Sequence, residues 1–149
     1  MKLNNGFDAS ASALTAQRLR MDVISSNIAN AETTRGKLVN GQFEPYIRKL
    51  TVMEPIKPKF SDVLNREMSH GQASGGVKVT QIMNDRTPSK LVYNPSHPDA
   101  DAAGYVKMPN VDVLKEMVDM ISATRSYEAN VTALNATKSM FVKALEIGK

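Results

Sequence analysis

Apolar residues recur at an interval of seven along the N-terminal part of the chain, with one further apolar residue beside the series. The members of this pattern are Phe7, Leu14, Met21, Ile24 and Ile28. Residues 7–35 contain neither Pro nor Gly, the two residues that most strongly break helices. The pattern predicts a helix with one narrow apolar seam that ends near residues 27–31.

The C-terminal part of the chain carries a second series of the same kind. Its apolar members are Val113, Met117, Met120, Tyr127, Val131, Leu134, Phe141 and Leu145. The region predicts one helix from Val111 to Ile147, with Asn110 as its N-cap candidate and Asp112 in its first turn. A helix of that length spans about 55 Å, whereas a compact domain of this chain length has a radius of gyration of ~15 Å. This helix therefore needs packing partners beyond its own globule.

The middle of the chain predicts strands and loops, because all seven prolines lie there. Residues 77–82 alternate apolar and polar, as a half-buried strand does, and residues 46–52 are a weaker candidate. Shorter extended segments are expected at 90–93 and 105–108, and a helical turn or two at 61–68. The predicted fold class is α+β, with long terminal helices that each carry an apolar seam and a small β-rich middle. The regions are a helical arm at 1–36, a β-rich part at 37–109 and a helical arm at 110–149.

Composition narrows the function classes. The net charge is +4. Basic and acidic residues occur together in all three regions, and the lack of a basic stripe argues against nucleic-acid binding. Cysteine is absent, which excludes a disulfide scaffold and a thiolate metal site. No apolar run approaches the ~18 residues that span a bilayer, and the N-terminal sequence lacks the apolar core of a secretory signal. The protein is therefore expected to stay in the cytosol or to leave without a cleaved signal.

The strongest candidate for metal or catalytic chemistry is the segment His97-Pro98-Asp99-Ala100-Asp101, with His70 elsewhere. Imidazole and carboxylate groups can bind metals, but Asn, Pro and Asp around residue 97 are typical of a turn, which we favour. The chain has no phosphate-binding glycine loop and no Gly-x-Ser-x-Gly motif. We therefore expect no catalytic residues, no metal and no cofactor.

Asn27 and Asn30 stand out because they lie on one helix face, next to Ile28 of the apolar seam. Amides buried in an assembly must be hydrogen-bonded and would fix the register of the packed helices. Alternatively, both residues cap the helix where it frays. Both interpretations remain open from the sequence.

Residues 12–34 resemble the N-terminal signature of bacterial flagellar rod, hook and hook-associated proteins, in which a helix ends in Asn-Ile-Ala-Asn and is followed by Thr and Gly. The chain departs from that pattern mildly at Arg35, where a tighter Thr-Gly turn is commoner. Further segments resemble the basal-body rod proteins more specifically: 75–79, 90–95, 104–112, 125–131 and 138–140.

The resemblance implies a structural subunit of the proximal rod, exported by the flagellar type III apparatus without a cleaved signal. It implies assembly with copies of itself, with rod proteins B, F and G and with basal-body protein E, in a shaft that transmits torque and encloses the export channel. It also implies that the long N- and C-terminal helices form a coiled-coil layer, with the β-rich middle further out. The expected assembly interface combines both apolar series with Asn27 and Asn30. The alternative function is a cytosolic homo-oligomeric coiled-coil adaptor.

Overall fold

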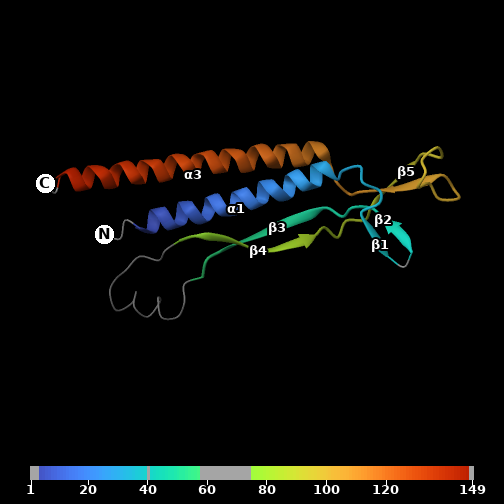
Figure 1. Cartoon of the computed structure of the whole chain (residues 1–149), viewed down its shortest axis with the longest axis horizontal. Coiled ribbons are helices and arrows are strands. Elements are labelled where there is room, and N and C mark those ends of the chain that lie inside the picture. The colour runs from blue at the N-terminus through green and yellow to red at the C-terminus, as the bar shows by residue number, and fades with distance from the viewer. Residues whose placement is uncertain (1–3, 40, 58–74, 148–149) are drawn as a thin grey trace. The chain divides into compact units, whose positions relative to one another are not determined.

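The computed structural model describes residues 4–39, 41–57 and 75–147 (Figure 1). The predicted helical turn at 61–68 and His70 lie outside these ranges. Two compact units make up the chain. The first comprises Met1–Arg20, Val52–Gln81 and Ala123–Lys149, and the second comprises Met21–Thr51 and Ile82–Ser122.

Both predicted helices are present. Helix α1 spans Asn4–Ala29 and helix α3 spans Val113–Ile147. The expected N-cap of α3 is wrong by two residues: Oδ1 of Asp112, not Asn110, accepts the N–H groups of Leu114 and Lys115 at 3.1 and 3.4 Å. Because the helix begins at Val113, Asp112 occupies the capping position, where its carboxylate also complements the helix dipole.

Among the residues that the structure describes, the middle of the chain forms three two-stranded sheets. The strands are β1 (Lys37–Val39), β2 (Gln42–Glu44), β3 (Lys49–Pro55), β4 (Val77–Asn84), β5 (Lys90–Tyr93) and β6 (Tyr105–Met108). The expected strands at 77–82, 90–93 and 105–108 are confirmed, and the α+β class with them. Strand β3 begins three residues later than the candidate at 46–52. The β1–β2 hairpin was missed, because strands of three residues are too short to show alternation.

Small residues allow the close packing of the first unit. Ala16 of α1 and Ala123 of α3 are 3% and 0% exposed. The hydroxyl of Ser12 accepts the N–H of Val77 at 3.2 Å, at the start of β4. A Cβ on Gly76 would lie 2.9 Å from an Ile56 methyl carbon and 3.0 Å from the Ser12 hydroxyl, so a larger residue here would require these two side chains to shift.

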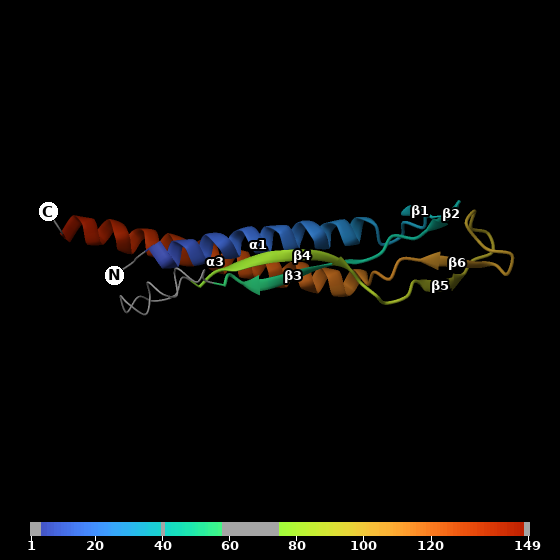
Figure 2. The same ribbon diagram turned by 90° about the horizontal axis from the view of Figure 1, so that it is seen from below.

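In the second unit, apolar side chains are buried on α1, on β6 and in the segment before α3. They are Val23, Ile24, Val106 and Val111. Strands β5 and β6 are antiparallel, with Val92 opposite Val106 and Tyr93 opposite Tyr105 (Figure 2). Two polar side chains of this unit are as deeply buried as the apolar ones, and they define the candidate site.

Candidate functional site

Polar side chains are buried in the second unit where α1 ends, β3 begins and α3 begins. Asn27 and Glu116 are each 1% exposed, and the side chain of Arg48 is 11% exposed. These three residues are called the buried polar cluster below. Burial of an amide and an ion pair is costly unless each group is hydrogen-bonded, so their partners decide what the cluster does.

The side-chain amide of Asn27 bonds to β3 as a neighbouring strand would. Its Nδ2 donates to the Lys49 carbonyl at 2.8 Å, and its Oδ1 accepts the Lys49 N–H at 2.9 Å, like a hydrogen-bonded pair in an antiparallel sheet. Nδ2 also donates to Oε2 of Glu116 at 3.0 Å, and Oδ1 also accepts the Tyr46 hydroxyl at 2.9 Å. The amide thus attaches the end of α1 to β3 and uses both its donor and its acceptor capacity.

Glu116, in the first turn of α3, has its two carboxylate oxygens bonded to different elements. Oε1 accepts Arg48 Nε at 2.6 Å and lies 2.5 Å from Arg48 Nη2, while Oε2 accepts the Asn27 amide. One partner comes from α1 and the other from the residue before β3. Loss of either partner would leave this buried carboxylate incompletely bonded.

Hydrogen bonds of its backbone and side chain hold Arg48 in the position from which it bonds to Glu116. Its N–H donates to Oδ1 of Asn110 at 3.0 Å, and its carbonyl accepts the Asp85 N–H at 2.8 Å. Its guanidinium also lies 3.4 Å from Asp85 and 3.7 Å from Asp119. Burial lowers the pKa of Arg48, but hydrogen bonds and charge from Glu116 and Asp85 outweigh burial and raise the pKa overall. Arg48 therefore remains charged.

The segment after β4 supports Arg48. The N–H and hydroxyl of Thr87 donate to Oδ1 of Asp85 at 3.0 and 2.7 Å. These hydrogen bonds, with a smaller contribution from Arg48, lower the pKa of Asp85. Asn110 donates its amide to the Thr87 carbonyl at 3.0 Å. Instead of capping α3, Asn110 links this segment to Arg48.

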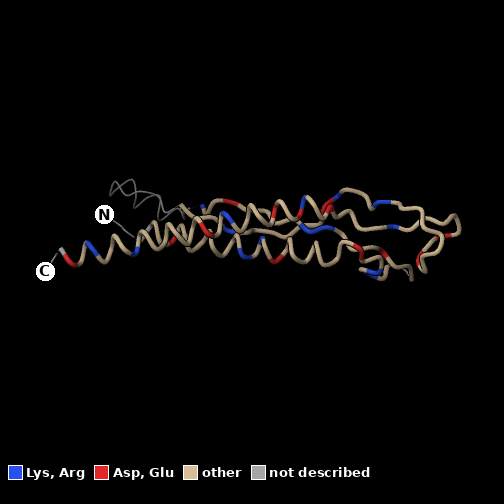
Figure 3. The backbone as a smooth tube through the Cα atoms, turned by 90° about the horizontal axis from the view of Figure 1, so that it is seen from above, with Lys and Arg blue, Asp and Glu red and all other residues tan. Residues whose placement is uncertain are grey.

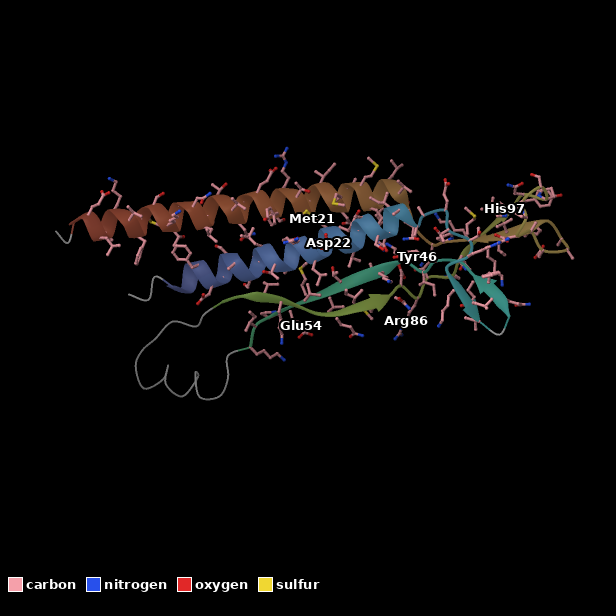
Figure 4. All side chains as sticks on the ribbon, viewed as in Figure 1. Met21, Asp22, Tyr46, Glu54, Arg86 and His97 are labelled. Carbon is pink, nitrogen blue, oxygen red and sulfur yellow. The ribbon has the colours of Figure 1, made fainter. Side chains whose placement is uncertain are left out.

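The loop after α1 places Tyr46, which lies beside the C-terminal end of that helix (Figure 4). The Tyr46 N–H donates to the Thr33 carbonyl at 3.0 Å. A Cβ on Gly36 would lie 2.7 Å from the Tyr46 nitrogen, so only glycine fits here. Packing therefore explains the glycine at position 36, because its lack of a side chain lets Tyr46 come close enough to bond to Asn27.

Asn30 has a different role from Asn27. Its Nδ2 donates to the Ser26 carbonyl at 2.9 Å, and its Oδ1 accepts the Thr33 hydroxyl at 3.3 Å. These bonds are local and close the end of α1, as the capping interpretation expects. The hydrogen bonds of Asn27 instead join it to residues of the same chain that are distant in the sequence.

The predicted interface residues differ in exposure. Ile24 is buried. The half-buried ones are Phe7, Leu14, Met21, Ile28, Met120, Tyr127, Val131 and Leu134. The exposed ones are Val113 at 42%, Met117 at 51%, Phe141 at 42% and Leu145 at 61%.

The first turns of α3 present apolar side chains to solvent. Leu114, Met117, Val118 and Ile121 are 76%, 51%, 67% and 61% exposed. Their spacing places them on one helix face, and they are called the exposed apolar stripe below. Contiguous exposed apolar residues mark interaction surfaces in soluble proteins.

The segment around His97 forms a turn. Nδ1 of His97 accepts the Asp99 N–H at 3.1 Å, and the carboxylate of Asp99 accepts the Thr34 hydroxyl at 2.7 Å and Arg35 Nε at 2.8 Å. Hydrogen bonds from Arg35 and Thr34, more than charge, lower the pKa of Asp99. Arg35, where the sequence departs from the flagellar pattern, thus ties the loop after α1 to the β5–β6 turn. No group of three metal-binding side chains occurs among the residues that the structure describes.

Charges are mixed along the backbone, with acidic and basic residues interspersed on both helices (Figure 3). Within the described ranges, neither helix combines the length and the apolar character that crossing a bilayer requires.

Comparison with known proteins matches both ends of the chain. Residues 7–36 match the family described as flagella basal body rod protein, and residues 102–147 match the C-terminal family of the FlgEFG flagellar basal body rod proteins. The chain is 60% identical to the flagellar basal-body rod protein FlgC of Bacillus subtilis, over 97% of each chain. It is 47% identical to FlgC of Salmonella typhimurium over the full length of both, and 43% identical to FlgC of Borreliella burgdorferi over 99% of this chain and 98% of that protein.

These matches confirm the resemblance and give no support to the cytosolic adaptor. The N-terminal match contains Asn27, and the C-terminal match contains Glu116 and the exposed apolar stripe. The chain therefore belongs to the FlgC family of flagellar basal-body rod proteins, and it is a structural subunit of the rod in the flagellar basal body, not an enzyme.

Proposed function

We propose that α1 and α3 pack with helices of neighbouring subunits as a coiled-coil layer of the rod, through apolar side chains that are exposed in the single chain. The main observation behind this proposal concerns the last described turns of α3. Every side chain from 138 to 146 is exposed there, including Met140, Phe141, Val142 and Leu145. Most helical stability in proteins comes from tertiary packing of an apolar face. A neighbouring helix would supply that packing here.

The exposed apolar stripe extends this proposal to the other end of α3. Burial of a Leu- or Ile-sized side chain contributes about 1.5–3 kcal/mol, so the four stripe residues would contribute substantially to each lateral contact. The helical arms at 1–36 and 110–149 would form the assembly layer, and the β-rich part at 37–109 would lie outside it. Packed contacts of this kind would transmit torque and enclose the export channel without a chemical step.

The proposed neighbours are copies of this chain, rod proteins B, F and G and basal-body protein E. The resemblance of residues 12–34 to the axial-protein signature supports this choice, because neighbours that carry the same signature can present matching helices. The same resemblance supports transit through the flagellar type III export apparatus.

A carboxylate in the stripe tests the proposal. Met117→Asp should reduce incorporation into basal bodies at least tenfold, because a charge buried in an apolar contact costs well above the ~1.4 kcal/mol that a tenfold change represents. The measurement is the amount of this subunit in basal bodies purified from a strain that expresses only the variant, together with swimming in soft agar.

Lys115→Asp is the matched control, since residue 115 is exposed, lies off the stripe and also receives a carboxylate. It should assemble within about twofold of the wild type. Normal incorporation of Met117→Asp would contradict the proposed assembly face.

A further inference from the structure

Glu116 occupies an unusual place on α3. It is the most buried side chain of the first turns, yet the stripe residues Leu114, Met117 and Val118 beside it are exposed. The most buried side chain by which this helix segment contacts its own chain is therefore a charged one. Docking of the segment depends on the partners of that charge.

Those partners come from separate parts of the sequence. Asn27 of α1 lies 89 residues from Glu116, and Arg48 lies 68 residues from it. Each bonds one carboxylate oxygen. Because a buried carboxylate without its partners is strongly unfavourable, the start of α3 is stable in this position only when both partners are present.

We propose that the folding of the exposed apolar stripe depends on the buried polar cluster. The first turns of α3, Val113–Ser122, stay folded on the chain only when the end of α1 and the start of β3 are both docked against Glu116. The cluster would thus be a conformational check on assembly. A chain whose α1 is not yet in place would not present an ordered stripe. The regulatory consequence rests on the assembly role proposed above, whereas the folding dependence does not.

Charged and titratable groups around Glu116 support the dependence on named partners. From the β3 side it faces Arg48, whose guanidinium also contacts Asp85 from the segment after β4 and Asp119 from α3. Since Arg48 is shared among these carboxylates, it satisfies Glu116 only in part. The Asn27 amide supplies the bond to the second oxygen, and this requirement couples α1 to α3.

Amide hydrogen exchange on the full-length purified chain tests the proposal. In the wild type, peptides covering 113–122 should be protected. Asn27→Ala should raise exchange there at least tenfold, while β5 and β6 stay protected. The matched control is Asn30→Ala, which removes a neighbouring amide with only local bonds and should leave 113–122 protected.

A second variant separates the cluster from general unfolding. Asn27→Ala combined with Glu116→Leu removes the charge that needs partners, so protection of 113–122 should return at least in part. Three results would each overturn the proposal. They are rapid exchange of residues 113–122 in the wild type, unchanged exchange there in Asn27→Ala, and failure of the double variant to regain protection of 113–122. Met117→Asp should keep wild-type protection, so failure of the assembly face and failure of the conformational check are distinguishable.

Discussion

Arg48→Met is expected to lower the free energy of unfolding by about 3–5 kcal/mol, because it removes the cationic partner of the Glu116 carboxylate, which is 1% exposed. Methionine keeps most of the side-chain volume, so the loss reflects the charge and hydrogen bonds rather than a cavity. Urea denaturation followed by circular dichroism measures it.

The exposed pair of Arg125 and Glu128 provides the control. Their side chains are 79% and 55% exposed, so Arg125→Met should cost less than about 1 kcal/mol. Glu116→Gln in the Arg48→Met background should recover most of the loss, since the amide needs no counter-charge. A cost below about 1 kcal/mol for Arg48→Met would contradict the importance of the ion pair.

Asn27→Asp is expected to cost at least about 3 kcal/mol, although it replaces one atom. A carboxylate cannot donate to the Lys49 carbonyl or to Glu116, which leaves buried acceptors without partners. It also places a second negative charge 3.0 Å from Oε2 of Glu116. Thermal and urea unfolding of the purified variant measure the effect.

Asn30→Asp is the matched change three residues along. Asn30 bonds only within the helix end, so we expect a cost of about 1 kcal/mol from one lost hydrogen bond and an acid at the helix C-terminus. Equal costs at the two positions would show that the long-range bonds of Asn27 contribute no more than a local cap.

The helices and most of the strands could be predicted from the sequence because they follow from local patterns. The seven-residue recurrence and the distribution of Pro and Gly located α1 and α3, and alternation located β4. The pattern predicts Asn110 as the N-cap and Asp112 in the first turn, whereas Asp112 is the cap. Both residue types cap helices well, and only the observed start at Val113 separates them.

The buried polar cluster could not be predicted, although Asn27 was singled out. Arg48 and Glu116 look like ordinary surface charges in the sequence, and their partners lie 68 and 89 residues away. One pattern in the sequence points to Glu116. It stands seven residues before Ala123, just as Met120 stands seven residues before Tyr127. Glu116 therefore lies on the same helix face as Ala123, which is 0% exposed. A charge on the inward face of a helix requires a buried partner, which in this case is Arg48.

Thiol labelling of Met117→Cys tests most directly the central claim that subunits of the rod cover the exposed apolar stripe. Because the sequence contains no cysteine, this thiol would be the only one in the subunit. We expect maleimide to label it readily in the free chain, where residue 117 is 51% exposed, and at least tenfold more slowly in purified basal bodies, with denatured basal bodies giving the total. Equal labelling rates in the free subunit and in the basal body would contradict the account.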